Sequence, residues 1–274
     1  DKDYIWGYAT ATAEEAFDLR DNGINKPILV LGYTFPYAYE KMLSLGIRPA
    51  VFREDMLKEL GDCAEKLLKS GVIKNPAPIH IAVDTGMSRI GIRHDKSGEE
   101  FVGKAFEVES LEIEGIFTHF ARADEKDLSN AKEREQIFAE FVKNAEIAAG
   151  RKIPIHHCAN SASIISIPES SMDMVRAGVT IYGMWPSDEV SKDIIDLKPA
   201  MELVSHIVMI KEVPAGTPVS YGGTFVTDSA SKIATIPVGY GDGYPRSLSN
   251  KGYVIINGHI SRSEERFSRN AETD

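Results

Sequence analysis

Apolar segments of strand length alternate with helical patterns over the first 175 residues, and this alternation limits the possible folds more than any other feature of the chain. The candidate strands are residues 4–9, 27–32, 48–52, 79–84, 113–120, 153–158 and 172–175. The candidate helices are residues 14–22, 37–45, 54–70, 99–106 and 129–149, and most of them stop at a glycine. Nearly continuous apolar strands separated by helices indicate parallel strands covered by helices.

The number of these units predicts the architecture. Seven strand candidates are too many for a typical flat sheet and one fewer than a (β/α)8 barrel contains. We therefore expect an α/β fold, a TIM-like (β/α)8-type barrel over residues 1–195 that is missing its first strand. The expected missing unit is the first β/α unit of the barrel.

The alternation of candidate strands and helices ends near residues 190–200. The strand-like segments 201–213, 219–225, 232–239 and 253–256 follow without a long helix, which predicts a partial β-rich domain over residues 196–260. Residues 261–274 contain seven charged side chains and only Phe267 as a large apolar one, so this segment is expected to be a disordered tail.

Composition excludes several classes of function. Lys and Arg number 31 against 41 Asp and Glu, which gives a formal net charge of −10 and argues against nucleic acid as a partner. The sequence has no apolar run long enough to span a membrane and no secretory signal at its start. The two cysteines, Cys63 and Cys158, match no metal or redox spacing, so we expect reduced thiols in a cytoplasmic protein without a metal site.

Polar residues gather where the candidate strands end. The segments that follow four of these strands, residues 84–89, 118–120, 156–161 and 176–179, supply two arginines, histidines, hydroxyl and amide groups and a glycine-containing turn. Catalytic groups of a barrel lie at the C-terminal ends of its strands. Arginine binds a carboxylate with two parallel hydrogen bonds, and a glycine turn can direct backbone N–H groups at a phosphate. The set predicts a site for a small anionic ligand.

Several motifs of the chain resemble the alanine racemase family. They are Asp-Thr-Gly-Met-Ser-Arg-Ile-Gly at 84–91, Thr-His-Phe-Ala at 118–121, Asn-Ser-Ala at 160–162, Val-Arg-Ala-Gly at 175–178, Tyr-Gly at 182–183, Val-Ser-Tyr-Gly at 219–222 and Ile-Pro-Val-Gly-Tyr-Gly-Asp-Gly at 236–243. Their order and spacing agree with the family up to about residue 259. The resemblance implies a pyridoxal 5′-phosphate-dependent enzyme, a head-to-tail homodimer, that interconverts L- and D-alanine for peptidoglycan by a two-base mechanism.

The resemblance assigns cofactor contacts to the barrel. Arg176 would face the pyridine nitrogen of the cofactor and keep it unprotonated, because two positive groups cannot share one contact. Ser161 and the backbone N–H groups of Gly178 and Val179 would hold the phosphate, with help from Asn160.

The resemblance also assigns the proton transfer and the substrate contacts. Tyr221 would be one of two catalytic bases, and it would need help because tyrosine ordinarily titrates near 10. His119 would contact Tyr221, and His157 would bridge toward Arg176. Arg89 would orient the substrate carboxylate, and a second tyrosine, Tyr240, would line the substrate entrance.

The chain departs from the family pattern at three places. Nothing in it matches the Lys-Ala-x-x-Tyr-Gly motif with the lysine that binds the cofactor covalently, and the sequence after residue 260 does not continue with the family's Cys-Met-Asp motif. Many relatives have a modified lysine where this chain has Ala82. We expect the chain as written to be a fragment that is inactive or nearly so.

Other functions stay open at this point. A racemase for serine or another small amino acid would use the same scaffold, and a non-catalytic cofactor-binding barrel is a further alternative, although it would have no use for Tyr221. A decarboxylase of this fold would have a glutamate where Arg176 stands. An unstable gene fragment without a function is the remaining alternative.

Overall fold

A parallel sheet organises the first unit of the protein. A computed structural model describes residues 2–263, and residues 1 and 264–274 lie outside the described residues. The strands are β1 (Tyr8–Thr10), β2 (Ile28–Val30), β3 (Ile47–Val51), β4 (Ala77–Asp84), β5 (Ile92–Arg93), β6 (Leu111–Phe117) and β7 (Ile155–His157). They pair in parallel in the order β1-β2-β3-β4-β6-β7, and the short β5 pairs with β4.

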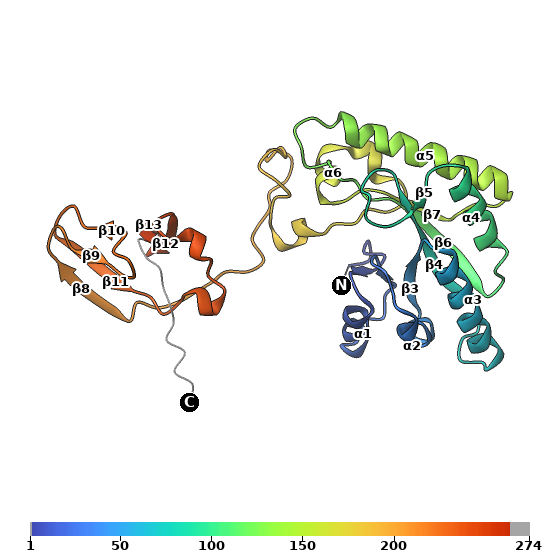
Figure 1. Cartoon of the computed structure of the whole chain (residues 1–274), viewed down its shortest axis with the longest axis horizontal. Helices are drawn as coiled ribbons and strands as arrows, with labels where there is room; N and C mark the ends of the chain where they lie inside the picture. Colours follow the sequence, from blue (N-terminus) through green and yellow to red (C-terminus); the bar gives the residue numbers. More distant parts are fainter. Residues whose placement is uncertain (1, 264–274) are drawn as a thin grey trace. The chain divides into compact units, whose positions relative to one another are not determined.

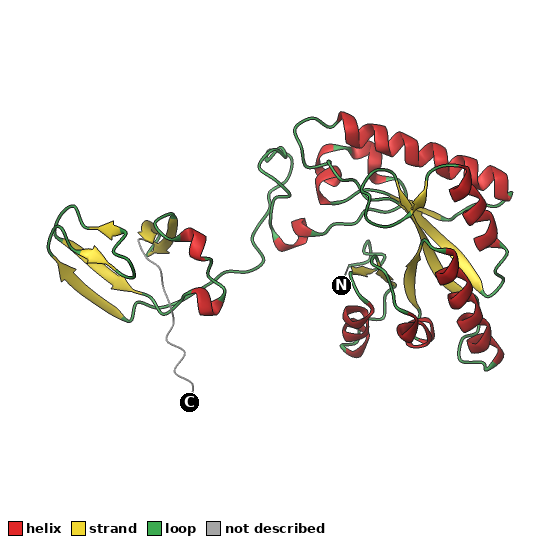
Figure 2. Ribbon diagram, viewed as in Figure 1, coloured by secondary structure: helices red, strands yellow, loops and turns green. Residues whose placement is uncertain are grey.

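The strand order follows the chain order, so each helical connection adds the next strand on the same side of the sheet. Figure 2 shows the resulting twisted sheet with the long helices lying along its outer side. This arrangement is the wall of a (β/α)-type barrel, as the alternation of strands and helices predicted.

The helices begin and end close to the predicted positions. They are α1 (Ala13–Asp21), α2 (Tyr39–Ser44), α3 (Glu54–Lys69), α4 (Lys96–Phe106), α5 (Ser129–Ala149) and α6 (Ser161–Ser166). Thr12 and Glu15 form a capping box at the start of α1. Gly150 ends α5 in the left-handed conformation, with φ at 62°, which a glycine adopts without a steric penalty.

The predicted strand at residues 172–175 is wrong. A 3-10 helix, η2 (Pro168–Ser171), precedes this segment, and Met172 has a φ of 40°, which strands do not adopt. Asp173 exchanges hydrogen bonds with the backbone of His156 in β7, and its carboxylate occupies the His156 N–H that a continuing ladder would need. The segment therefore runs beside β7 without forming a strand.

The main core fills the space between the sheet and the helices. Ile79, Ile81 and Ile116 point from β4 and β6 toward Leu60 of α3 and Phe138 of α5, and all five side chains are fully buried. Side chains on the other face of the same strands, Ala82 and Phe117 among them, form a separate small cluster. The alternation leaves the inner face of the curled sheet free for polar residues.

The contacts of the chain divide it after Ala200, and the second unit begins at Met201 (Figure 1). Its strands are β8 (Met209–Val213), β9 (Pro218–Val219), β10 (Phe225–Val226), β11 (Ser231–Thr235), β12 (Gly252–Ile256) and β13 (His259–Ser263). They form three antiparallel pairs, β8 with β11, β9 with β10 and β12 with β13. The last pair turns at Asn257 and Gly258, which both have positive φ, as a tight hairpin turn requires.

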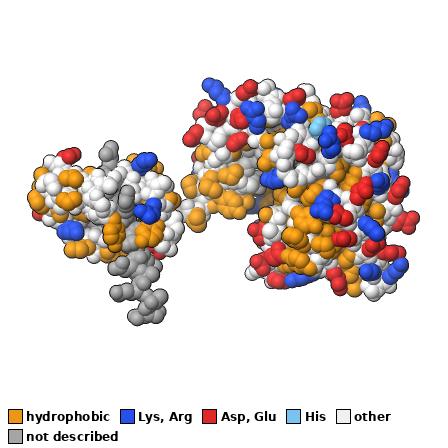
Figure 3. All heavy atoms as spheres, in the orientation of Figure 1, with side chains coloured by type: hydrophobic (Ala, Val, Ile, Leu, Met, Phe, Trp, Pro, Cys, Tyr) orange, Lys and Arg blue, Asp and Glu red, His pale blue; other side chains and the backbone are white. Residues whose placement is uncertain are grey.

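Several sequence expectations for the second unit need correction. The strand expected at 219–225 is two short strands, β9 and β10, with a loop between them, and the strand expected at 232–239 ends at Thr235. Residues 201–208 are irregular, so the strand expected at 201–213 begins only at Met209. Residues 261–263 were expected in a disordered tail but belong to β13, and the rest of that expected tail, 264–274, lies outside the described residues. Large apolar side chains are exposed on the unit (Figure 3), among them Met201, Leu203 and Val204.

None of the helices in the described part of the chain is long and apolar enough to cross a membrane.

Candidate active site

The loop after β4 is shaped so that it carries Arg89 beyond the strand end. The Asp84 carboxylate accepts hydrogen bonds from the backbone N–H groups of Gly86 (2.8 Å) and Ser88 (3.0 Å), which folds the loop back on itself. Gly91 has a φ of 125°, and a Cβ there would lie 2.4 Å from the Asp84 backbone nitrogen. Only glycine fits this return, and the exposed Arg89 stands on the outer part of the loop.

Arg89 and His119 line one cavity of about 50 Å³ together with Ala82 and Phe117. Burial, reinforced by the positive charges of Arg176 and Arg89, lowers the pKa of His119 to about 4. His119 is therefore neutral at physiological pH and can accept or donate a hydrogen bond without carrying charge.

Arg176 is held by three hydrogen bonds, and none of them uses its Nε. Its Nη1 lies 2.5 Å from Nδ1 of His157, and its Nη2 donates to the carbonyls of Thr118 (2.7 Å) and Cys158 (3.2 Å). The guanidinium carbon lies 5.3 Å from the centre of the Phe117 ring. Burial lowers the pKa of Arg176 to about 10, so the side chain remains cationic at neutral pH.

The Nε atom of Arg176 is buried, and among the described residues it has no hydrogen-bond partner. A buried donor without a partner costs about 1–3 kcal/mol. A ligand with an acceptor atom at this point would recover that free energy. The atom is therefore a candidate contact for a ligand.

A cluster of hydroxyl and backbone N–H groups forms next to Arg176. The Oγ of Ser161, the first residue of α6, accepts a hydrogen bond from the Gly178 N–H over 2.8 Å and lies 3.2 Å from the Thr180 hydroxyl. Asn160 caps α6, since its Oδ1 accepts from the Ser163 N–H over 3.1 Å. Sequence reasoning included Ser161, Gly178 and Asn160 but missed Thr180, which no motif marked.

Asn160 also ties this cluster to the end of β6, because its side-chain amide donates to the Phe120 carbonyl over 3.3 Å. Val179, the remaining residue expected at the phosphate, begins the 3-10 helix η3 (Val179–Tyr182) directly after Gly178. The hydroxyl groups and this turn offer several donors to a small dianion.

The two tyrosines expected at the site belong to the second unit. Tyr221 lies in the loop between β9 and β10, between Ser220 and Gly222, which both have positive φ, and 65% of its surface is exposed. Tyr240 begins the 3-10 helix η4 (Tyr240–Asp242), is also exposed, and lies under the guanidinium of Arg246. Neither ring is needed for the packing of its own unit.

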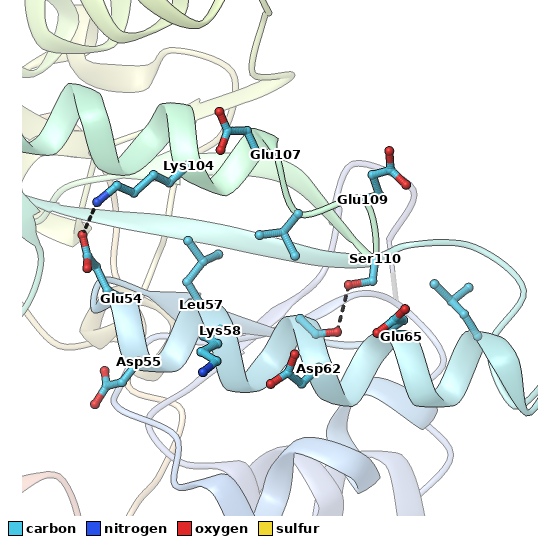
Figure 4. A pocket seen from close by; sticks show the side chains of 13 residues that line it. Glu54, Asp55, Leu57, Lys58, Asp62, Glu65, Lys104, Glu107, Glu109 and Ser110 are labelled. Carbon is cyan, nitrogen blue, oxygen red and sulfur yellow. Dashed lines mark hydrogen bonds and ion pairs between the residues drawn. The ribbon is translucent and has the colours of Figure 1, made fainter.

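A surface groove of about 890 Å³ lies elsewhere (Figure 4). It runs between α3 and the segment that joins α4 to β6, so it lies at the opposite end of β6 from His119. Figure 4 shows that carboxylates surround it, and that Lys104 is paired with Glu54 across it over 2.6 Å. The groove has no feature of the anionic-ligand site predicted from the sequence.

Comparisons with known proteins point to one family. A sequence profile described as "Alanine racemase, N-terminal domain" matches residues 2–186, and one described as "Alanine racemase, C-terminal domain" matches residues 200–267. The chain is 40% identical to an alanine racemase of Carboxydothermus hydrogenoformans over 251 residues and 44% identical to one of Methanococcus maripaludis over 250 residues. These matches cover 92% and 91% of this chain but only 66% and 65% of the two relatives.

Solved structures give the same result. The alanine racemase of a D-cycloserine-producing Streptomyces lavendulae superimposes with a TM-score of 0.85 at 32% identity, covering 96% of this chain and 68% of that one. The alanine racemase of Clostridium difficile does so with a TM-score of 0.82 at 36% identity, covering 93% of this chain and 65% of that one. A structure of the Bacillus anthracis alanine racemase with bound L-Ala-P has a TM-score of 0.79 at 34% identity, covering 95% and 66%.

Proposed function

This chain belongs to the alanine racemase family, and on that premise we propose that the longest form its gene encodes interconverts L- and D-alanine with pyridoxal 5′-phosphate as cofactor. The 274 residues of this chain, which contain no Lys-Ala-x-x-Tyr-Gly motif, are by the same proposal inactive or nearly so. The observation that carries the proposal is the buried Nε of Arg176, which has no hydrogen-bond partner among the described residues, together with the Ser161 hydroxyl, whose oxygen accepts from Gly178 and whose O–H can still donate. One end of this site needs an acceptor atom, and the other end suits a dianion.

The residues of the site fit this cofactor. Arg176 would contact the pyridine nitrogen, and Ser161, Gly178 and Val179, supported by Asn160, would hold the phosphate. A Cβ at Gly178 would lie 3.6 Å from the Ser161 Oγ, so the absence of a side chain keeps the approach to this hydroxyl open. Pyridoxal phosphate, when bound, would supply an electron sink for the bond between the substrate Cα and its hydrogen.

Arg176 sets the electronic character of such a site. Its guanidinium has no acceptor atom and stays protonated, so it can only donate to the pyridine nitrogen. That nitrogen then remains unprotonated, because a second proton at the contact would place two positive groups against each other. A weaker electron sink favours simple proton exchange at Cα over other reactions of amino acids.

The remaining residues would bind substrate and move protons. We assign Tyr221 as one of two bases, with its phenolic oxygen holding the proton, and neutral His119 as its hydrogen-bond partner. Arg89 would bind the substrate carboxylate, and Tyr240 would line the substrate entrance. His157 would act through Arg176, to which it is hydrogen-bonded.

Names of solved relatives support a small amino-acid substrate, since one is an alanine racemase complex with cycloserine and another contains L-Ala-P. We further propose a head-to-tail homodimer in the cytoplasm that supplies D-alanine for peptidoglycan, without a nucleic-acid or membrane partner. A racemase for serine uses the same contacts, so the test must include both amino acids.

The test is a chiral assay. Purified protein, in the longest form that its gene encodes, is incubated with pyridoxal phosphate and L-alanine or L-serine, and both enantiomers are measured over time. We expect D-alanine to form faster than D-serine. We expect Tyr221→Phe to slow the faster reaction equally in both directions, because each direction uses both bases and the two enantiomers have equal free energies. Faster D-serine formation would establish the serine alternative, and saturable cofactor binding without turnover would establish the non-catalytic one.

A further inference from the structure

Hydrogen bonds continue from Arg176 through the inside of the curled sheet to a second arginine. His157 Nε2 lies 2.8 Å from His80 Nδ1, and His80 Nε2 lies 3.1 Å from a carboxylate oxygen of Glu114. Arg48 binds both oxygens of that carboxylate, through Nε (2.9 Å) and Nη2 (3.0 Å). The two histidines are completely buried, and the row of five side chains connects the site to β3 by direct hydrogen bonds.

The chemistry of the two ends fixes every proton in this row. Arg176 can only donate, so His157 Nδ1 must accept; ionised Glu114 can only accept, so His80 Nε2 must donate. Two neutral imidazoles satisfy both ends only if each carries its proton on Nε2. A proton added to either ring would place two donors face to face.

The charges agree with this assignment. Burial raises the pKa of Glu114, but the hydrogen bonds from His80 and Arg48 outweigh burial and lower the pKa to about 2. Burial also lowers the pKa of His80, and it lowers that of His157 well below its usual value. The contact between His80 and Glu114 is therefore a hydrogen bond from a neutral ring to a carboxylate.

Two local features of the sheet place the Glu114 carboxylate where it can accept the hydrogen bond from His80 Nε2. Ile79 of β4 pairs with Ile113, whereas the next residue, His80, pairs with Gly115, so Glu114 is an extra residue in β6. A bulge of this kind redirects one side chain, and here it brings the carboxylate to the same side of the sheet as His80. A Cβ at Gly115 would lie 2.4 Å from the His80 ring, so glycine provides the space for the imidazole.

We propose that Glu114, held by Arg48, is a positioning residue that fixes the tautomers of His80 and His157 and thereby holds Arg176 with its Nε directed at the cofactor. The consequence for the cofactor rests on the proposed function, whereas the tautomers do not. Sequence motifs drew attention to His157 but not to His80, Glu114 or Arg48.

The first test uses the unaltered chain without cofactor. Nitrogen-15 NMR of labelled histidines, with signals assigned by single substitutions, reports which ring nitrogen carries the proton. We expect His80 and His157 both to be neutral and protonated on Nε2 at pH 7.5. A proton on Nδ1 of either ring, or an imidazolium, would overturn the proposal even if no variant can be purified.

The second test separates Glu114 from Arg176. In Arg176→Met the histidines should keep their tautomers, because Glu114 still orients them from the other end. In the double variant Arg176→Met with Glu114→Gln both tautomers should be populated, because an amide can donate or accept. Mixed tautomers in the single variant would mean that Arg176 alone sets them, which contradicts the proposal.

The third test addresses the consequence for the cofactor. Glu114→Gln should weaken saturable binding of pyridoxal phosphate about tenfold, the scale seen when an outer partner of a binding group is lost. The matched control is Glu112→Gln, an exposed residue of the same strand that carries the same charge change. If the tautomers respond as expected but affinity falls equally in both variants or in neither, Glu114 does not position Arg176. If neither the unaltered chain nor any variant binds the cofactor, the proposed function is wrong, while the tautomer assignment stands.

Discussion

The backbone N–H of Gly178 donates to the Ser161 Oγ over 2.8 Å, which joins the start of α6 to the segment that follows Arg176. The Thr180 hydroxyl lies 3.2 Å from the same oxygen. Because the lone pairs of Ser161 receive these donors, its own O–H is free to donate to a ligand. The hydroxyl thus acts as an acceptor within the protein and as a donor toward the proposed phosphate.

Ser161→Ala should therefore weaken the binding of pyridoxal phosphate by about ten- to a hundredfold, since a hydrogen bond to a charged group contributes about 1.5–3 kcal/mol. Absorbance titration of the chain with the cofactor measures this affinity. Ser166→Ala, at the other end of the same helix, is the control and should bind normally. Equal affinities for the two variants would show that Ser161 does not hold the phosphate.

Gly115→Ala should destabilise the first unit by about 1–3 kcal/mol, because the new methyl group would meet the His80 ring at 2.4 Å. Gly103→Ala is the same substitution in helix α4, where a Cβ meets nothing within 4 Å, and it should stabilise the protein by about 1 kcal/mol. Urea unfolding of both variants gives the two free energies. We expect the change in the free energy of unfolding to have opposite signs in the two variants. Destabilisation of both would point to a general effect of the added methyl group.

Stability should fall as the pH is lowered from about 6.5 toward 4, because His119 has a pKa of about 4 in the folded protein and near 6.5 when unfolded. In that window the unfolded chain binds a proton that the folded chain excludes, at a cost of about 1.4 kcal/mol per pH unit for each such histidine. We expect the free energy of unfolding, measured in urea from pH 7.5 to 4.5, to depend less steeply on pH in His119→Asn than in the unaltered chain.

The free energy of unfolding of His119→Asn should still depend on pH, because the buried His80 and His157 also resist protonation. His206→Asn, at an exposed position of the second unit, is the control and should keep the original slope. If His119→Asn retains the full slope, His119 is not buried enough to exclude a proton.

Glu146 of α5 is 5% exposed and receives three donors, namely Lys152 Nζ (2.6 Å), the Ile153 N–H (2.9 Å) and His156 Nε2 (3.2 Å). Glu146→Gln removes the charge and leaves at least one of these donors without an acceptor, so it should cost about 1–3 kcal/mol. Thermal unfolding measures the loss. Glu140→Gln, on an exposed turn of the same helix, should change little, and an equal loss there would refute the role of the buried carboxylate.

Local signals in the sequence were sufficient for the regular elements. Gly150 ends α5 at the predicted residue because a left-handed glycine is a strong stop, and Thr12 begins α1 through a capping box that can be read from four residues. The strand expected at 172–175 failed for a tertiary reason, since the Asp173 carboxylate takes the backbone N–H of His156 that a strand would have used. No local pattern contains that information.

The residues of the candidate site also form two groups, those that sequence motifs marked and those that only the tertiary structure reveals. Motifs marked Arg176, Ser161 and His157, although the strand expected before Arg176 does not form. The structure joins Arg176 to His157, and it joins Ser161 to Gly178, two residues after Arg176. Glu114 could not be recognised, because its place beside His80 depends on a one-residue shift in register between β4 and β6, and the two residues are 34 positions apart in the sequence. The strand β6 contains two glutamates, Glu112 and Glu114, and nothing in the local sequence distinguishes the one that lies beside His80.

The order of the strands has a consequence for biosynthesis. Since β1 to β7 pair in the order in which the ribosome releases them, the sheet can grow during translation, and Arg48, His80 and Glu114 can meet long before Arg176 is made. Glu114 then holds the imidazole of His80 in its final state from the outset. Arg176 is synthesised last, and it meets His157 Nδ1, which is already an acceptor. Before that, the charge of Glu114 is paired with the charge of Arg48.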